Sequence, residues 1–441
     1  MPVSDRPAAV PPHEGPPAPP GSVVVVGAGL AGARTVLELR AQGFTGRVTV
    51  LGAEPVAPYD RPPLSKHLLD RPAPAWLADE LGADALELAD EVRLGTPATG
   101  LDLTGPGVVV RTADGGVAGD AVVVATGAAA VRPPGWDAAL TLHTARDAER
   151  LRAALGVAVP ASSAAPADAR GVPAGRRLVV VGAGWVGAEV ATVAAAAGAD
   201  VTVVEARPEP LGAVLGPRVG SLTAPWYAAA GVRLRAGVPV AAVAPDAVTL
   251  ADGTVLPADA VLVAVGARPA TAWLGGALAT GPDGAVPVDE LYAPIGGPAR
   301  VRVVGDAATR RSARHGWVPG GHWDAALRGP AVAVAGLLGR EPAEPDVAPY
   351  VFSTQLGHEL ALHGVPGAAD EVLLRGDPAA ADGWSALWFE PGTDRLTAVF
   401  CVDRPRDVGG ARRLFSGAVL PVLDRGRAAD PAVPLARALA G

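Results

Sequence analysis

The sequence has a single cysteine, Cys401, so the chain can form neither an internal disulfide nor a redox-active dithiol pair. A cysteine cluster for zinc or an iron–sulfur centre is excluded as well. Long apolar runs are also missing, because no stretch approaches the roughly 18 consecutive apolar residues that a membrane-spanning helix needs. We therefore expect a cytoplasmic protein without a membrane segment.

Basic residues are outnumbered by acidic ones, and the net charge of −8 comes without any basic run suited to nucleic acid. Lysine is nearly absent, since Lys66 is the only lysine among 37 basic residues. Arginine has replaced lysine elsewhere, which suggests that position 66 needs a compact ammonium group. Chance survival of one lysine is the alternative. We treat Lys66 as a candidate functional residue.

Residues 1–21 are rich in proline and have neither the basic start nor the apolar core of a secretion signal, which predicts a disordered tail. In the whole sequence, hydrophobic residues make up 49% and charged residues 19%, which is enough material for buried cores. A length of 441 residues suits two to four domains.

One pattern occurs twice, about 155 positions apart: a valine-rich strand, a glycine turn, an alanine-rich helix, and a second strand ending near an acidic residue. The glycines of such a turn let the backbone approach a pyrophosphate, and the helix N-terminus adds free N–H donors. A lone glycine fingerprint is weak, but both copies here have the strand, helix and acid that the mechanism needs. We predict two dinucleotide-binding folds. The copies are Val23–Val26, Gly27–Gly32, Arg47–Val50 and Glu54, and Leu178–Val181, Gly182–Gly187, Val201–Val204 and Glu205.

Further strands extend this design. Ala121–Val124 and Ala260–Val265 each run into a glycine-containing segment, and we interpret both as crossings between the two domains. Val301–Val304 ends in Gly305-Asp306-Ala307, where glycine permits close approach to a ligand and the aspartate can accept a hydrogen bond from a sugar-alcohol hydroxyl. Residues 160–175 read as a surface loop. From about residue 341, short strands at 350–353, 359–362 and 386–389 predict a third, α+β domain.

The segment Pro58–Lys66 reads PYDRPPLSK and closely resembles a signature of the FAD-dependent NADH:ferredoxin reductases of bacterial cytochrome P450 and aromatic-ring dioxygenase systems. With both glycine fingerprints, Gly305-Asp306-Ala307 and His322-Trp323-Asp324, the resemblance covers residues 22–440. It implies an α/β fold with two Rossmann-like FAD/NAD(P)-binding domains of the glutathione-reductase type and a C-terminal α+β domain. The expected boundaries are 22–145 and 276–340 for the FAD domain, 146–275 for the NADH domain, and 341–441 for the C-terminal domain.

The resemblance places FAD on the first repeat and NADH on the second. Gly27, Gly29 and Gly32 then face the FAD pyrophosphate, Asp306 its ribityl chain, and Glu54 its adenosine ribose. The backbone N–H of Trp323, at the start of a helix through residue 338, faces the flavin pyrimidine ring and stabilises negative charge there. The full set of expected cofactor-binding residues is Gly27, Gly29, Leu30, Ala31, Gly32, Glu54, Arg61, Lys66, Ala98, Thr126, Gly127, Gly182, Gly184, Trp185, Val186, Gly187, Glu205, Gly266, Gly305, Asp306 and Trp323.

In the second repeat, the carboxylate of Glu205 ends the strand, where it accepts the ribose hydroxyls of NADH and repels the additional phosphate of NADPH. NADH is therefore the expected coenzyme, although Arg207 weakens that exclusion. Family members are similar in pairing the glutamate at position 189 with the motif lysine beside the flavin. We expect a Lys66–Glu189 ion pair, shielded from water, as the catalytic pair. The alternative is that Glu189 is a solvated helix residue.

The chain departs from the family pattern at four positions, which puts rate, flavin affinity and partner choice in doubt. Gly321 and Ala325 replace a carboxylate and an amide near the flavin. His143 stands where an arginine faces the FAD phosphates, and Phe352 replaces a tryptophan of the C-terminal domain. His322 is either a proton shuttle or a structural residue at a helix start, and we favour the structural role.

The resemblance implies that hydride passes from NADH to the flavin, which then releases two electrons singly to a [2Fe–2S] ferredoxin supplying a cytochrome P450 or a ring-hydroxylating (Rieske) dioxygenase. We expect a monomer. Ferredoxins are typically acidic, so docking needs a local basic patch. Its candidates are Arg310, Arg311, Arg314, Arg404, Arg406, Arg412 and Arg413, unless these are ordinary solvated arginines.

Two other functions remain open. One is a different flavoenzyme, such as an NADH oxidase or the reductase portion of a nitrite reductase. The missing cysteines and the PYDRPPLSK signature weigh against it. The other is a protein resembling apoptosis-inducing factor, which binds FAD and NADH but works mainly through interaction. Sluggish NADH oxidation without acceptor turnover would favour this second alternative.

Overall fold

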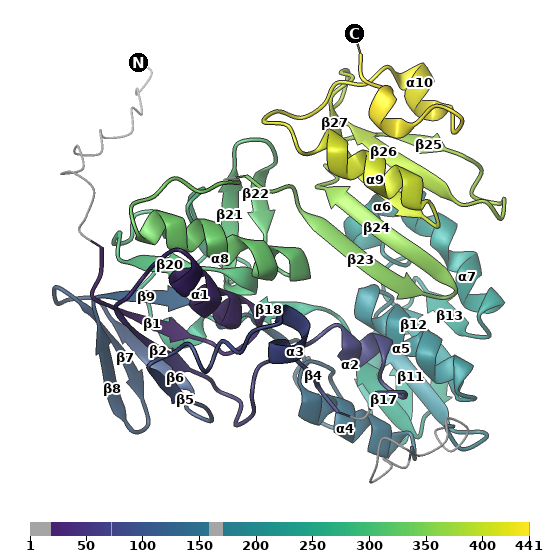
Figure 1. Ribbon diagram of the computed structural model, residues 1–441. Helices are drawn as coiled ribbons and strands as arrows, with labels where there is room; N and C mark the ends of the chain where they lie inside the picture. Colours follow the sequence, from purple (N-terminus) through teal and green to yellow (C-terminus); the bar gives the residue numbers. More distant parts are fainter. Residues whose placement is uncertain (1–18, 72, 158–170, 345, 441) are drawn as a thin grey trace, which may run out of the picture.

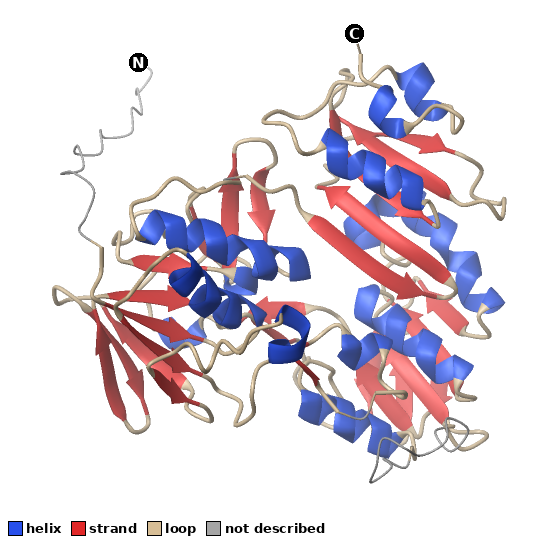
Figure 2. Cartoon of the chain, viewed as in Figure 1, coloured by secondary structure: helices blue, strands red, loops and turns tan. Residues whose placement is uncertain are grey.

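The computed structural model describes residues 19–71, 73–157, 171–344 and 346–440. Most of the predicted N-terminal tail, and residues 160–170 of the predicted surface loop, lie outside the described residues. Within the described ranges, no helix has both the length and the apolar character needed to cross a membrane. The chain forms three units, which Figure 1 shows side by side and Figure 2 shows to mix helices and strands throughout.

The first unit contains a five-stranded parallel sheet made from segments far apart in the sequence. Its order is β20 (Val301–Val303), β9 (Ala121–Val124), β1 (Ser22–Val26), β2 (Arg47–Leu51) and β5 (Glu91–Arg93). The valines of β1 and β9 are buried on both faces, as a central parallel strand requires. Helices α1 (Leu30–Ala41) and α8 (Trp323–Leu337) lie together on this sheet (Figure 1).

Smaller elements complete the first unit. An antiparallel sheet of β6 (Ala98–Asp102), β7 (Val108–Thr112) and β8 (Gly115–Gly119) adjoins the parallel sheet. A second small sheet contains β19 (Val286–Val288), β21 (Ala308–Ser312) and β22 (Gly316–Pro319). The PYDRPPLSK segment forms β3 (Tyr59–Asp60) and the single-turn helix α2 (Pro63–Lys66), followed by β4 (Ala75–Trp76) and α3 (Leu77–Leu81).

The second unit repeats the strand–turn–helix–strand arrangement of the first, so the prediction of two dinucleotide-binding folds is confirmed. Its parallel sheet has the order β13 (Arg233–Ala236), β12 (Asp200–Glu205), β11 (Arg177–Val181) and β17 (Ala260–Val263). Helix α5 (Trp185–Ala196) follows the second glycine turn. The unit also contains α4 (Ala145–Ala154), α6 (Gly212–Gly220), α7 (Ala224–Ala229), β14 (Val240–Val243), β15 (Ala247–Leu250) and β16 (Val255–Pro257).

The two segments interpreted as crossings lie side by side. After β9 and β17 the chain forms β10 (Ala128–Ala130) and β18 (Ala267–Pro269), which pair antiparallel. The hydroxyl of Thr126 donates to the carbonyl of Ala270 at 2.8 Å and also links these two connecting segments. The second strand ends at Val263, two residues earlier than the pattern indicated. Leu140 already bridges to Leu262, so the chain joins the second sheet before residue 145.

The third unit is an antiparallel sheet covered on one face by helices. Its order is β23 (Tyr350–Gln355), β24 (His358–Gly364), β27 (Leu396–Val402), β26 (Trp384–Phe389) and β25 (Glu371–Arg375). The predicted α+β character and the three predicted strands are thus confirmed. Helices α9 (Pro405–Leu414) and α10 (Arg425–Ala429) pack against the sheet, and β23 contacts α5 of the second unit (Figure 1).

A buried ion pair links the parts of the third unit. Arg375 of β25, which is 1% exposed, donates to both carboxylate oxygens of Asp407 on α9, at 2.9 and 3.2 Å. The same guanidinium donates to the carbonyls of Ala428 and Val433 in the C-terminal segment. One side chain therefore connects the sheet, α9 and the end of the chain.

Replacing Asp407 with alanine should leave a buried, uncompensated guanidinium and lower the free energy of unfolding by about 3–5 kcal/mol. Urea unfolding followed by tryptophan fluorescence measures this loss. The matched control is Glu390→Ala, which breaks an exposed pair with Arg395 in the same unit and should cost no more than about 1 kcal/mol. Equal losses for the two variants would show that the buried pair does not hold the unit together.

Candidate functional site

A cavity of about 560 Å³ lies where the first unit meets α5 and β23. This volume is within the range typical of cofactor and ligand sites, about 300–1,000 Å³. The cavity extends from the first glycine turn to the side chains of Lys66 and Glu189. Of the site residues expected from the sequence, those at its wall are Gly27, Gly29, Leu30, Ala31, Glu54, Arg61, Lys66, Ala98, Thr126, Gly127, Trp185, Val186, Glu189, Gly305, Asp306 and Trp323.

Six expected residues are not at the wall of this cavity. Gly32 lies in the first turn of α1, where a Cβ atom would collide with the carbonyl of Gly27, so its role is close packing of the helix against the turn. The other five belong to the second unit. They are Gly182, Gly184, Gly187, Glu205 and Gly266.

The first glycine turn has the shape of a pyrophosphate cradle. Gly27 has a φ of +117°, and a Cβ there would collide with the backbone of Ala125. At Gly29, by contrast, a Cβ would meet no atom within 4 Å. The space in front of Gly29 is therefore left open by the protein, and the N-terminus of α1 adjoins it. These features fit a dinucleotide phosphate.

Glu54 is held in place by two neighbours from the PYDRPPLSK segment. The phenol of Tyr59 donates to its Oε2 atom at 2.6 Å, and Arg61 donates to its Oε1 atom at 3.2 Å. Burial raises the pKa of Tyr59, with the hydrogen bond to Glu54 as a further cause, so the phenol remains a donor. The carboxylate is thus oriented at the cavity wall, where it can accept ribose hydroxyls.

His143 does not carry the positive charge that an arginine would bring. Burial, and then the charge of Arg61, lowers the pKa of His143 to about 4, so the ring is neutral at physiological pH. Arg61 contacts the ring Nε2 atom and donates to the His143 carbonyl at 3.1 Å. Arg61 therefore supplies the cationic group in this part of the cavity.

Asp306 and α8 form another part of the wall. The Oδ1 atom of Asp306 accepts from the backbone N–H of Gly321 at 2.9 Å, and burial raises the pKa of this aspartate. Gly321 has a φ of +98°, a conformation that disfavours the larger residue found in the family pattern. The indole of Trp323 donates to Asp60 at 2.7 Å. Helix α8 begins at the cavity wall, where its first N–H groups are available to a ligand.

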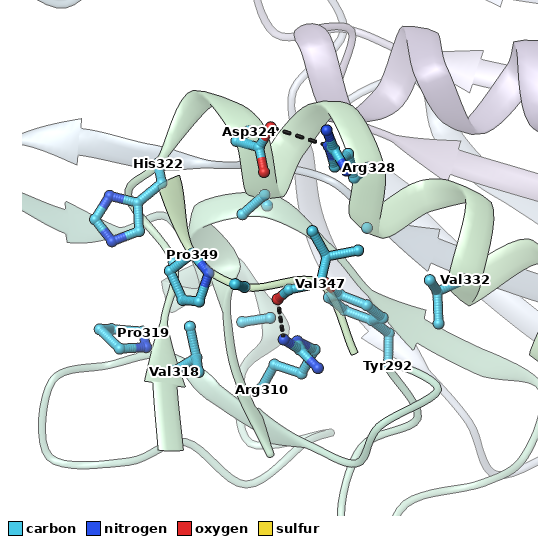
Figure 3. A pocket seen from close by; sticks show the side chains of 16 residues that line it. Tyr292, Arg310, Val318, Pro319, His322, Asp324, Arg328, Val332, Val347 and Pro349 are labelled. Atoms are coloured by element: carbon cyan, nitrogen blue, oxygen red, sulfur yellow. Dashed lines mark hydrogen bonds and ion pairs between the residues drawn. The ribbon is translucent and has the colours of Figure 1, made fainter. Parts of the chain in front are cut away.

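His322 precedes α8 without capping it through its side chain. Burial lowers its pKa, which favours the neutral ring. It also borders a second cavity of about 40 Å³, which lies between α8, the β21–β22 hairpin and residues 347–349 (Figure 3). Ala325 is at the wall of this small cavity, so the longer amide side chain of the family pattern would occupy some of the space.

The predicted ion pair between Lys66 and Glu189 is present. The Nζ atom of Lys66 contacts the Oε1 atom of Glu189, and the two side chains are 15% and 5% exposed. The structure adds two donors that the sequence reasoning missed. Ser65 donates to Oε2 of the same carboxylate and Ser353, from the third unit, donates to Oε1, each at 2.5 Å. Ser65 stands in the PYDRPPLSK segment and Ser353 in the predicted strand at 350–353, but no spacing rule connects them to position 189.

Phe352 keeps an aromatic ring at the position where the family has tryptophan. Its ring centroid is 5.3 Å from Nζ of Lys66, within cation–π range, and 6.1 Å from the indole of Trp323 in an edge-on arrangement. The side chain is 39% exposed at the wall of the large cavity. Phe352 therefore places an aromatic ring beside Lys66 at the wall of this cavity.

The second glycine turn has its own carboxylate. Glu205 accepts from the backbone N–H of Ala183 at 2.8 Å and from that of Arg207 at 2.9 Å. A Cβ atom at Gly184 would meet nothing within 4 Å, as at Gly29 in the first turn. Trp185 and Val186, the first residues of α5, border the large cavity, so the second turn leads toward the Lys66–Glu189 pair.

The expectation that Arg310 and Arg314 contribute to a basic patch is wrong. Both side chains are buried against Asp346, and Arg314 also donates to the carbonyls of Phe415 and Gly417 (Figure 3 shows Arg310 beside Val347). Arg404 is likewise mostly buried and pairs with Asp407. The buried carboxylates that attract these arginines could not be assigned from local sequence. The remaining exposed candidates are Arg311, Arg406, Arg412 and Arg413.

Comparisons with known proteins agree with this geometry. The pyridine nucleotide-disulphide oxidoreductase pattern matches residues 21–324, and the reductase C-terminal pattern matches residues 350–439. A probable ferredoxin reductase of Castellaniella defragrans is 33% identical, covering 93% of this chain and 97% of the relative. The ferredoxin–NAD(+) reductase subunit of the benzene 1,2-dioxygenase system of Pseudomonas putida is 33% identical over 90% of this chain and 93% of its own length.

A solved structure of a reductase also matches nearly the whole chain. Putidaredoxin reductase, crystallised in a covalent complex with putidaredoxin, has a TM-score of 0.82 and 28% identity to this chain. The match covers 94% of this chain and 97% of that one. The likeness therefore extends over all three units.

The two open glycine positions predict separable effects. Gly29→Ala should leave the apoprotein stable, because the new Cβ meets no protein atom, but should weaken FAD binding by at least about tenfold by filling the space for the pyrophosphate. Gly184→Ala should retain FAD and weaken NADH binding instead. Flavin content after dialysis and a titration with NAD(H) measure the two effects. Full flavin retention in Gly29→Ala would contradict this placement of FAD.

Proposed function

The chain belongs to the pyridine nucleotide-disulphide oxidoreductase family, and we propose that it passes electrons from NADH through FAD to a [2Fe–2S] ferredoxin of a cytochrome P450 or ring-hydroxylating dioxygenase system. It is an oxidoreductase of the ferredoxin reductase type that uses FAD and NADH. One observation carries the proposal: a single cavity joins the first glycine turn to a shielded Lys66–Glu189 pair beside α5. The proposal includes a cytoplasmic location, where NADH is available.

The wall of the cavity suits FAD along its length. We assign the pyrophosphate to the turn at Gly27 and Gly29, the adenosine ribose to Glu54, and the ribityl chain to Asp306. Arg61 supplies positive charge in place of the arginine missing at position 143. The N-terminus of α8 supplies N–H donors and partial positive charge for the flavin ring. This division follows the family resemblance, and all of these residues line the one cavity.

NADH approaches from the second unit in this proposal. Glu205 is fixed by two backbone N–H groups and keeps acceptor capacity for the ribose hydroxyls, whereas a 2′-phosphate would meet its negative charge. Trp185 and Val186 lie between this turn and the large cavity. The nicotinamide would therefore be directed along the start of α5 toward Lys66.

When bound, the flavin accepts a hydride from NADH and releases two electrons singly. The protein contributes orientation and charge: the ammonium group of Lys66 contacts Glu189 and lies within cation–π range of the ring of Phe352, and both contacts restrict its position. No thiol takes part, because Cys401 is fully buried and burial raises its pKa to about 12. Glu189 and Lys66 thus act without a redox disulfide.

The exposed arginines of α9 are the proposed docking group for an acidic ferredoxin. Arg406 stands at the start of the helix, and Arg412 and Arg413 in its last turn. Burial raises the pKa of Asp324, and Arg328 and Arg412 oppose this, which places Arg412 near the first turn of α8. Arg412 therefore lies near the start of α8, whose first residue, Trp323, is at the wall of the large cavity.

Anaerobic stopped-flow mixing tests the proposed function. NADH should bleach the yellow flavin rapidly, NADPH should do so much more slowly, and a [2Fe–2S] ferredoxin should then restore the flavin absorbance. Bleaching followed by reaction with oxygen alone would indicate an oxidase. Bound flavin with sluggish bleaching and no acceptor turnover would indicate a protein that works through interaction.

Reversing the charge of Arg412 and Arg413 together, each to glutamate, should raise the KM for ferredoxin about tenfold or more at low salt, because steering and docking use opposite charges. Flavin reduction by NADH should be unchanged. Arg395→Glu, an exposed arginine outside α9, is the matched control. A similar loss in the control, or none in the double variant, would place docking elsewhere.

A further inference from the structure

Strand β23 and the turn residue that follows it, Leu356, are held to helix α5 by two hydrogen bonds whose partners on α5 are one helical turn apart. Ser353 donates to Glu189, and three residues later the backbone N–H of Leu356 donates to the hydroxyl of Thr192 at 2.7 Å. The Leu356 bond is formed by backbone on the strand side, so it holds the strand to the helix whatever residue stands at 353. Attachment of the two units therefore does not require the hydroxyl of Ser353.

The hydroxyl of Ser353 is nevertheless buried, and it both donates and accepts a hydrogen bond. Ser353 is 1% exposed and donates to Oε1 of Glu189 at 2.5 Å, the same oxygen that Lys66 contacts. The buried side chain of Gln355 donates in turn to the Ser353 oxygen at 3.0 Å. Because its acceptor role is satisfied by Gln355, the hydroxyl hydrogen is directed to Glu189.

The carboxylate of Glu189 consequently accepts bonds from two other units. Ser65 and Lys66 of α2 donate from the first unit and Ser353 donates from the third. A glutamate has three rotatable bonds, and donors on both oxygens restrict it to one orientation. Without Ser353, the oxygen facing Lys66 loses its second donor, and the carboxylate can turn away.

The neighbouring residue on β23 acts on the other member of the pair. Successive residues of a strand point to opposite faces, so Phe352 faces the cavity while Ser353 faces α5. Phe352 contacts Lys66 directly and Ser353 contacts Glu189. Two consecutive residues of the third unit thus contact the two members of the ion pair, one each.

We propose that Ser353 is a positioning residue through which the C-terminal sheet sets the orientation of the Lys66–Glu189 pair during hydride transfer. The inference rests on the proposed function and deepens it. It assigns to the third unit a part in the first half of the reaction, the reduction of the flavin, in addition to any contact with the electron acceptor.

The test compares holoprotein variants that differ by one hydroxyl. Ser353→Ala should slow flavin reduction at saturating NADH about tenfold, equivalent to about 1.4 kcal/mol, because the carboxylate loses one charge-assisted hydrogen bond. Ser353→Thr, which restores the hydroxyl, should recover most of the rate. Thr354→Ala removes a hydroxyl from the exposed face of the same strand and should change nothing.

A second readout does not depend on turnover. The midpoint potential of bound FAD, measured by equilibration with a reference dye, should become more negative in Ser353→Ala, because the positive charge of Lys66 is held less firmly near the reduced flavin. It should return toward the wild-type value in Ser353→Thr. Loss of packing alone at position 353 would leave the potential where it is.

A double-mutant cycle decides whether Ser353 acts through Glu189. In a Glu189→Ala background, Ser353→Ala should cause no further slowing. Equal factors in both backgrounds, or a Ser353→Ala protein that reduces and titrates like Thr354→Ala, would overturn the inference. A Ser353→Thr protein as slow as Ser353→Ala with full flavin content would also overturn it. A wild-type protein that NADH does not bleach would instead refute the proposed function.

Discussion

Burial of the Glu189 carboxylate at the meeting point of three units is the constraint on which the rest of the site depends. A buried, unpaired carboxylate costs several kcal/mol, so its neighbours must compensate it. Here they come from α2, in the first unit, and from β23, in the third. The requirement to satisfy one charge therefore specifies how these three parts of the chain meet, and it places Lys66 at the wall of the large cavity.

The two nucleotide folds share the same glycine-turn geometry but have different surroundings. In each, the first glycine of the turn has a positive φ and lies against backbone that follows an adjacent strand of the sheet, and a later glycine leaves open space in front of the helix N-terminus. The first turn opens into a cavity that the other two units help to enclose. The second turn leads toward that cavity along α5. A shared local geometry can therefore serve a resident cofactor in one copy and an exchanging one in the other.

The structure shows which contacts are made at the four positions where the chain departs from the family pattern. Arg61 lies beside the neutral His143 and provides the missing positive charge, and Phe352 retains an aromatic contact with Lys66. Gly321 adopts a left-handed conformation and presents its N–H to Asp306. Ala325 borders the small cavity behind α8. Each change thus alters a contact near the proposed flavin position while the arrangement of strands and helices is preserved.

Local patterns in the sequence were sufficient for the two nucleotide folds and the strands of the third unit. Strand, turn and helix signals extend over only a few residues. The Lys66–Glu189 pair joins distant parts of the chain, and its prediction came from the family resemblance of the PYDRPPLSK segment. Only the tertiary structure revealed the part of Ser353, which lies 164 positions from Glu189, and the burial of Arg310 and Arg314 against Asp346. A serine or an arginine has the same local signature whether it is solvated or buried. Whether such a side chain is solvated or buried depends on the partner that folding places beside it, and that partner comes from a distant part of the chain.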